Sequence, residues 1–118
     1  MKSDQTFYIT TSIMYANSAP HIGFALELIQ ADVLARYNRM LGYKTWFLTG
    51  TDEHGMSVAR AAEKQGKKPQ ELVDEIADSV QKLAKTLNIS NDDFIRTTDR
   101  KRHWPAVEKL WRALQARG

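Results

Sequence analysis

The first residues that could do chemistry form a short run at the expected start of a helix, Pro20-His21-Ile22-Gly23-Phe24. A helix N-terminus offers backbone N–H groups and a partial positive charge, which together suit phosphate oxygens. Gly23 would let a ligand approach the backbone closely, and His21 could add a side-chain donor toward phosphoryl oxygens. An isolated histidine at a helix start also commonly caps or packs there, and spacing alone weighs the two interpretations about equally.

A second polar run, Thr51-Asp52-Glu53-His54, follows an apolar segment. A carboxylate in this position could hold an ammonium group, ligate a metal ion or act as a base. Asp52 could instead cap the helix that follows, and these residues alone slightly favour the capping role. Asp52 and His54 do not make a metal site by themselves, because a third and a fourth ligand are not apparent. The sequence therefore predicts no metal site in this chain.

Other common signatures are missing from the 118 residues: G-x-G-x-x-G, G-x-x-x-x-G-K-[ST], H-E-x-x-H and G-x-S-x-G. Cysteine is also absent, which excludes disulfides, thiolate metal sites and cysteine nucleophiles. The basic run Arg100-Lys101-Arg102-His103 could touch RNA, but such runs are more typical of a solvated helix face. The net charge of +3 is too mild to indicate an anionic partner.

The spacing of apolar residues predicts the elements that position the two polar runs. Strands are expected at residues 6–11, 44–49 and 94–98, with a loop at residues 12–20. Helices are expected at residues 22–41, at 56–65, from Pro69 to Leu87, and around Val107, Leu110, Trp111 and Leu114. One helix carries an unbroken apolar stripe that predicts the core: Leu72, Val73, Ile76, Val80, Leu83, Ala84 and Leu87.

Alternating strands and helices predict an α/β domain with a parallel sheet. Ligands bind such sheets at the carboxyl ends of the strands, and both polar runs follow a strand. Residues 1–118 contain no linker and make one domain or a piece of one. No apolar stretch approaches the roughly 20 residues of a membrane span, and Met1–Asp4 show no leader pattern, so a cytoplasmic protein without membrane contact is expected.

Four segments, in matching order along nearly the whole chain, resemble one family. Ala19–Gly23 after a strand resembles the His-Ile-Gly-His signature of class I aminoacyl-tRNA synthetases, and Phe47–Gly55 is similar to a stretch typical of methionyl-tRNA synthetases. Tyr8–Asn17 and Asp93–Thr98 also look like that family. The resemblance implies a Rossmann-like sheet and a partial catalytic domain over residues 1–118, the first half of the nucleotide-binding domain, ending near the family's connective insertion.

The resemblance also implies a reaction and site residues. The family uses ATP with Mg²⁺ to convert methionine to methionyl-adenylate, then transfers methionine to tRNA. Asp52 would hold the methionine ammonium group. The other implied roles are ATP binding by His21, Gly23 and Phe24, catalysis by His21, and methionine contact by Ile13 and Tyr15.

The sequence departs from the family pattern in two ways. Phe24 stands where the signature has its second histidine, and a phenyl ring cannot donate a hydrogen bond, so we expect His21, backbone groups and Mg²⁺ to suffice. The 118 residues also lack the family's Lys-Met-Ser-Lys-Ser loop, its connective insertion, which often bears zinc, and its anticodon-binding domain. We therefore expect little or no methionine activation by this chain alone.

Three other points follow. The alternative to a ligase fragment is a truncated, non-catalytic module that binds a nucleotide or amino acid or serves only in interactions. Another class I substrate is disfavoured, because other members for apolar amino acids usually differ in the Gly50–Gly55 region. A parallel sheet cut in half would expose an apolar strand edge, which predicts self-association.

Overall fold

A computed structural model describes residues 5–118. Met1–Asp4, where no leader was expected, lie outside the described residues. None of the helices within residues 5–118 is both long and apolar enough to cross a membrane. The elements in chain order are β1 (Thr6–Thr10), β2 (Met14–Tyr15), α1 (Ile22–Met40), β3 (Lys44–Asp52), α2 (Met56–Lys64), α3 (Pro69–Thr86), β4 (Asp93–Arg96) and α4 (Trp104–Gln115).

Strand β3 is the centre of a sheet in which every strand pair is parallel. Thr51 pairs with Met14 of β2 and also with Arg96 of β4, so those two strands flank β3 on opposite edges. Leu48 pairs in the same way with β1 and β4. Strands β1 and β2 therefore follow one another along a single edge of β3. The expected α/β architecture with a parallel sheet is confirmed.

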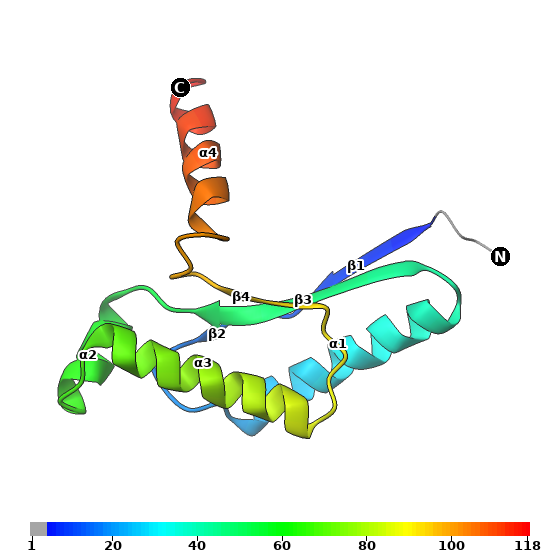
Figure 1. The fold of residues 1–118 in the computed structure, drawn as a ribbon, viewed down its shortest axis with the longest axis horizontal. Helices are drawn as coiled ribbons and strands as arrows, with labels where there is room; N and C mark the ends of the chain where they lie inside the picture. Colours follow the sequence, from blue (N-terminus) through cyan, green and yellow to red (C-terminus); the bar gives the residue numbers. More distant parts are fainter. Residues whose placement is uncertain (1–4) are drawn as a thin grey trace.

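Helices α1 and α3 cover one face of the sheet and α2 packs against α3, whereas α4 stands away from the sheet (Figure 1). Residues from β2, from the position that follows it, and from α1, α2 and α3 form the larger core cluster. The stripe expected on α3 accounts for much of it, although Leu83 and Leu87 at its far end are only partly buried. The cluster consists of Met14, Ala16, Phe24, Leu28, Val58, Ala62, Leu72, Val73, Ile76 and Val80.

The predicted strands need correction. The segment expected as a loop at 12–20 contains β2, and β3 continues to Asp52 instead of ending at residue 49. Strand β3 continues through Gly50. A glycine fits there because β3 and β4 approach closely: a Cβ at Gly50 would sit 2.1 Å from the Ile95 carbonyl oxygen. The extension carries Asp52 to the very end of β3.

Helix α1 is apolar on two sides, and only one of them packs on the sheet. Phe24, Leu28, Ala31 and Ala35 are buried, whereas a second apolar stripe faces solvent. The exposed stripe comprises Ile22, Leu26, Ile29, Val33, Tyr37 and Met40. A helix that is apolar on two sides gives no unique prediction of the side that packs inward.

A charged clamp joins α1 to the chain that enters β4. The Asp32 carboxylate accepts hydrogen bonds from the Ser90 backbone (2.7 Å) and from Arg36 Nε (2.6 Å). Arg39 reaches the Ser90 carbonyl (3.0 Å) and the Asp92 carboxylate (2.7 Å). Burial raises the pKa of Asp32, but the hydrogen bonds from Ser90 and Arg36 outweigh it and hold that pKa below its usual value.

Candidate functional site

The carboxyl ends of the strands meet the start of α1 around a cavity of about 230 Å³. The cavity is lined by Ser12, Ile13, Met14, Tyr15, His21, Gly23, Phe24 and Glu27. All the site residues expected from the sequence line it, with the exception of Asp52. Asp52 lies beside it, because it is the sheet partner of Tyr15. The two polar runs therefore converge at the carboxyl ends of the strands.

His21 is the N-cap of α1. Its Nδ1 accepts hydrogen bonds from the backbone N–H groups of Gly23 (3.1 Å) and Phe24 (3.4 Å). An accepting Nδ1 places the proton of a neutral imidazole on Nε2, which makes no hydrogen bond to any described residue. Capping and donation toward a ligand are therefore compatible, since they use different ring nitrogens.

The same cap changes how the start of α1 can meet an anion. Because the imidazole already accepts from Gly23 and Phe24, those backbone donors are not open to a phosphate in this structure. A Cβ on Gly23 would lie 3.0 Å from both Cε1 and Nδ1 of His21. Glycine at this position thus admits the histidine ring, and the expected close approach of a ligand to Gly23 stays a prediction.

Phe24 turns its side chain into the core, where it is 4% exposed and packs in the cluster that contains Met14 and Leu28. Part of it still reaches the cavity wall. A phenyl ring offers a surface there and no hydrogen-bond donor. Its role in ATP binding stays a prediction.

Sequence reasoning missed a carboxylate on the cavity wall. Glu27 accepts hydrogen bonds from the backbone N–H of Ser12 (2.5 Å) and from its hydroxyl (2.8 Å). These bonds tie the loop between β1 and β2 to α1, and so fix the neighbouring Ile13 against the cavity. Glu27 lies four residues after Gly23 and so on the same side of α1, and this spacing could have predicted that Glu27 faces the cavity.

Asp52 does not cap the following helix, so the capping role that its residue type slightly favoured is wrong. The N-cap of α2 is Gly55, which provides no side chain, and no other side chain caps that helix. The half-buried Asp52 carboxylate makes no hydrogen bond or ion pair with any described residue. An anionic group beside a cavity, without a protein partner, is available to a cationic ligand.

Glu53 has the opposite environment, although it is the next residue. Its side chain has 0% exposure and accepts from Arg96 Nε (2.7 Å), Arg96 Nη2 (3.1 Å) and the Thr51 hydroxyl (2.6 Å). The Thr98 hydroxyl donates to it as well. The hydrogen bond with Glu53 raises the pKa of Arg96 further, and Arg96 also contacts Asp74 at 2.5 Å. Glu53 therefore anchors the segment that presents Asp52.

His54 contacts the segment that follows β4. Its Nε2 lies 3.2 Å from the Thr97 carbonyl oxygen, and its ring centre lies 6.3 Å from that of Trp104. Trp104 donates from its indole nitrogen to the same carbonyl (3.1 Å). Within residues 5–118, no group of three or more His, Cys, Asp or Glu side chains is placed to hold a metal ion.

The chain is similar to known proteins over almost its entire length. The family model described as "tRNA synthetases class I (M)" matches residues 7–118. Two relatives named methionine–tRNA ligase are 52% identical over 95% of this chain (Thermotoga maritima) and 47% identical over 98% (Brucella suis). A solved Mycobacterium tuberculosis methionyl-tRNA synthetase, in complex with methionyl-adenylate, is 46% identical over 95% of this chain, with a TM-score of 0.91.

The chain spans only part of these proteins: 18% of the Thermotoga protein, 22% of the Brucella protein and 22% of the solved Mycobacterium chain. The match nevertheless covers both polar runs, the parallel sheet and all four helices. The fold is accordingly the Rossmann-like fold of the class I catalytic domain. Because that match covers almost the entire chain, the chain belongs to the family described as "tRNA synthetases class I (M)".

Proposed function

We propose that this chain provides the methionine-binding and adenylate-forming portion of a methionine–tRNA ligase. The observation that carries the proposal is the free carboxylate of Asp52 beside the cavity formed by Ile13, Tyr15 and His21. In this site Asp52 holds the ammonium group of methionine, since opposite charges attract strongly where water is partly excluded. Ile13 and Tyr15 contact the rest of the amino acid.

The reaction joins methionine to the α-phosphate of ATP and releases pyrophosphate. Negative charge develops on the phosphoryl oxygens during the attack of the methionine carboxylate, so a fixed donor there stabilises the transition state. His21 is suited to this task, because the cap through Nδ1 holds its ring in place and leaves Nε2–H as the donor. Mg²⁺ bound to ATP neutralises further charge on the phosphates. No step requires a hydrogen bond from Phe24.

The complete reaction includes transfer of methionine to tRNA and belongs in the cytoplasm, where ATP and tRNA are both present. A structural zinc ion, where a ligase of this family has one, belongs to its connective insertion and not to residues 5–118. Residues 1–118 contain no Lys-Met-Ser-Lys-Ser loop to stabilise the triphosphate. We therefore infer that this chain alone binds methionine and catalyses little or no exchange.

The test is to measure methionine binding and methionine-dependent exchange of pyrophosphate into ATP with the purified 118-residue chain. Calorimetric binding of methionine, with leucine and isoleucine binding more weakly, is the expected result. Absence of methionine binding would contradict the proposal and leave the non-catalytic interaction module as the better interpretation. Clear exchange by the chain alone would contradict the inferred need for the missing loop.

A further inference from the structure

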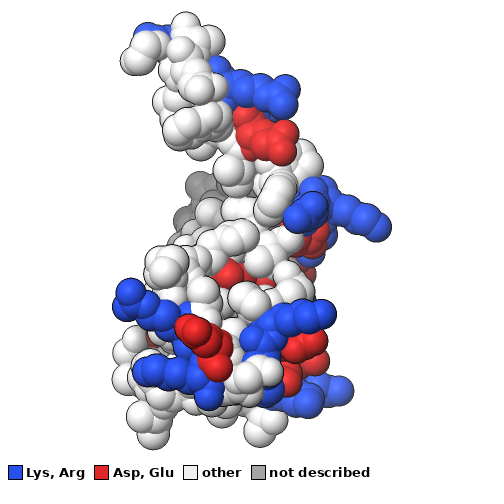
Figure 2. Space-filling view, turned by 90° about the vertical axis from the view of Figure 1, so that its left-hand side faces the viewer, with Lys and Arg blue, Asp and Glu red and all other residues white. Residues whose placement is uncertain are grey.

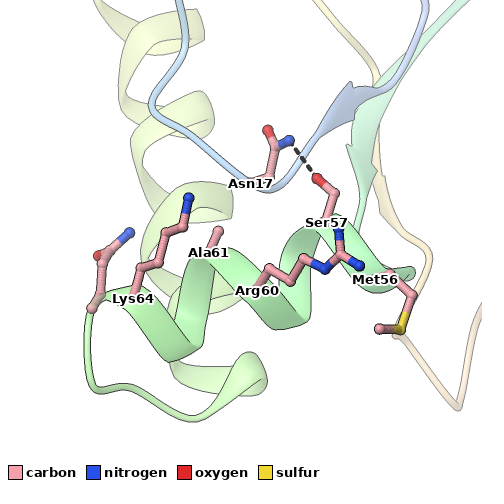
Figure 3. A pocket seen from close by; sticks show the side chains of 7 residues that line it. Asn17, Met56, Ser57, Arg60, Ala61 and Lys64 are labelled. Carbon is pink, nitrogen blue, oxygen red and sulfur yellow. Dashed lines mark hydrogen bonds between the residues drawn. The ribbon is translucent and has the colours of Figure 1, made fainter.

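A second hollow, larger than the first, lies along α2. It has a volume of about 610 Å³ and is lined by Asn17, Met56, Ser57, Arg60, Ala61, Lys64 and Gln65. In Figure 3 the side chains of Ala61 and Lys64 rise from α2 toward the loop that carries Asn17, and Arg60 extends along α2 toward Ser57 and Met56. We call this hollow the α2 groove. None of the site residues expected from the sequence lies in it.

Two cations of the α2 groove have no protein partner. Arg60 and Lys64 stand one turn apart on α2, and neither makes an ion pair or hydrogen bond with any described residue. Two other basic residues, by contrast, are neutralised: Lys67 contacts Glu75 at 2.6 Å, and Arg96 contacts Glu53 and Asp74. Figure 2, which views the molecule toward α2, accordingly shows basic and acidic side chains interspersed. The α2 groove therefore presents two free charges and not a broad basic field.

The remaining wall of the groove contains a hydrogen-bonded polar pair and an exposed methionine. Asn17 Nδ2 donates to the Ser57 hydroxyl at 2.7 Å, as the dashed line in Figure 3 marks. Because the Ser57 oxygen accepts this bond, its own O–H can donate to a ligand. Met56 is 68% exposed at the groove and offers an apolar surface against which a base can lie. Two cations, a hydroxyl donor and an apolar surface suit the phosphates and bases of a polynucleotide.

The α2 groove begins where the candidate site ends. Asn17 is two residues beyond Tyr15, and Met56 directly follows Gly55. A Cβ on Gly55, whose φ is +113°, would lie 2.2 Å from the Tyr15 hydroxyl oxygen. The Tyr15 side chain is thus seated on the turn that starts α2, between the cavity near His21 and the groove.

We propose that the α2 groove binds the single-stranded 3′ end of tRNA through its phosphates and leads that end to the methionine beside Tyr15. This rests on the proposed function, which requires a tRNA terminus to reach the activated methionine. Phosphate is the shared chemistry of RNA and of free pyrophosphate. The groove favours RNA, because its volume far exceeds one phosphate group and its cations lie about 6 Å apart along the helix axis, where each can meet a different phosphate.

The test is fluorescence anisotropy of a short, labelled, single-stranded RNA ending in CCA, titrated with the 118-residue chain at about 50 mM and about 200 mM salt. The groove variant is Arg60→Gln with Lys64→Gln. The matched control is Lys82→Gln with Lys85→Gln, which removes the same charge from α3. We expect the groove variant to lose about tenfold in affinity, and its salt dependence to become shallower by about 1.4 in log–log slope, since each single-strand phosphate contact contributes about 0.7.

The control variant should keep most of the affinity and the original slope. Equal losses in the two variants, or no RNA binding by the unchanged chain at low salt, would overturn the proposal. Displacement of the RNA by pyrophosphate, beyond that by chloride at equal ionic strength, would assign the groove to free phosphate instead. Methionine binding, measured in parallel, separates this inference from the proposed function: an unchanged chain that binds methionine but no RNA would overturn only the groove.

Discussion

Asp52 and Glu53 are adjacent carboxylates with opposite environments. Glu53 is enclosed and accepts hydrogen bonds from Arg96, Thr51 and Thr98, whereas Asp52 has no partner among the described residues. A residue that is satisfied by the protein stabilises the fold, and one left without a partner is available to a ligand. The two should therefore respond to substitution in different assays.

Replacing Asp52 by Asn should weaken methionine binding by about tenfold to a hundredfold, because a hydrogen bond to a charged group contributes about 1.5–3 kcal/mol. The shape of the side chain is retained, so the melting temperature should change little. Isothermal titration calorimetry gives the affinity. The control is Asp78→Asn, since Asp78 is an exposed carboxylate on α3. Equal methionine affinities of the two variants would show that Asp52 does not bind methionine.

Replacing Glu53 by Gln should lower the free energy of unfolding by about 2 kcal/mol, since the buried side chain loses its charge-assisted hydrogen bonds with Arg96 while Arg96 keeps Asp74 as a partner. Urea unfolding, followed by circular dichroism, measures the change. Glu75→Gln is the matched control, because its ion pair with Lys67 is exposed and should contribute less than about 1 kcal/mol. Similar effects of the two substitutions would show that Glu53 does not anchor this loop.

At the scale of elements, the clamp between α1 and the entry to β4 makes stability depend on pH. The pKa of Asp32 is lower in the folded chain than in the unfolded chain, where it is about 3.9. Its contribution is therefore fully present above pH 4 and is lost as the pH falls through the lower, folded pKa.

Asp32→Asn should be less stable than the unchanged chain at neutral pH, and the difference should shrink below about pH 4. The measurement is the urea midpoint as a function of pH. Asp78→Asn serves again as a control, because its carboxylate has no partner in the structure. A difference that stays constant down to pH 2.5 would mean that the Asp32 charge contributes no stability through its partners.

The sequence predicted most elements and the end of the sheet where the candidate site lies, because strand and helix periodicities were clear and both polar runs followed strands. It did not predict β2, since two residues give no periodicity. The inward side of α1 was ambiguous because both sides are apolar. The burial of Glu53 could not be predicted either: a carboxylate is normally exposed, and the partner that makes burial tolerable, Arg96, lies 43 positions away.

The whole molecule leaves apolar surface uncovered. Tyr8 on β1 is 62% exposed and Trp46 on β3 is 51% exposed, on the sheet face that the helices leave open. Within residues 5–118, neither β1 nor β4 has a strand on its outer edge. Edges of this kind pair with other chains, so we expect copies of this chain to associate.

Sedimentation velocity should show a mass that rises with concentration. Tyr8→Lys should oppose association by placing a charge on the edge strand, whereas Tyr37→Lys makes the same change on the exposed stripe of α1. A monomer at all concentrations would contradict the expectation. Dissociation by Tyr37→Lys alone would locate the contact on α1 and not on the sheet.

Helix α4 has no buried residue, and its apolar side chains, Val107, Leu110, Trp111 and Leu114, all face solvent. It contacts the rest of the molecule through Trp104, its first residue. Cooperative protection of amide protons requires tertiary contacts, so α4 should open separately from the sheet. In a hydrogen–deuterium exchange time course, the amides of α4 should be replaced orders of magnitude faster than those of β3, and the molecule should behave as two units of very different lifetime.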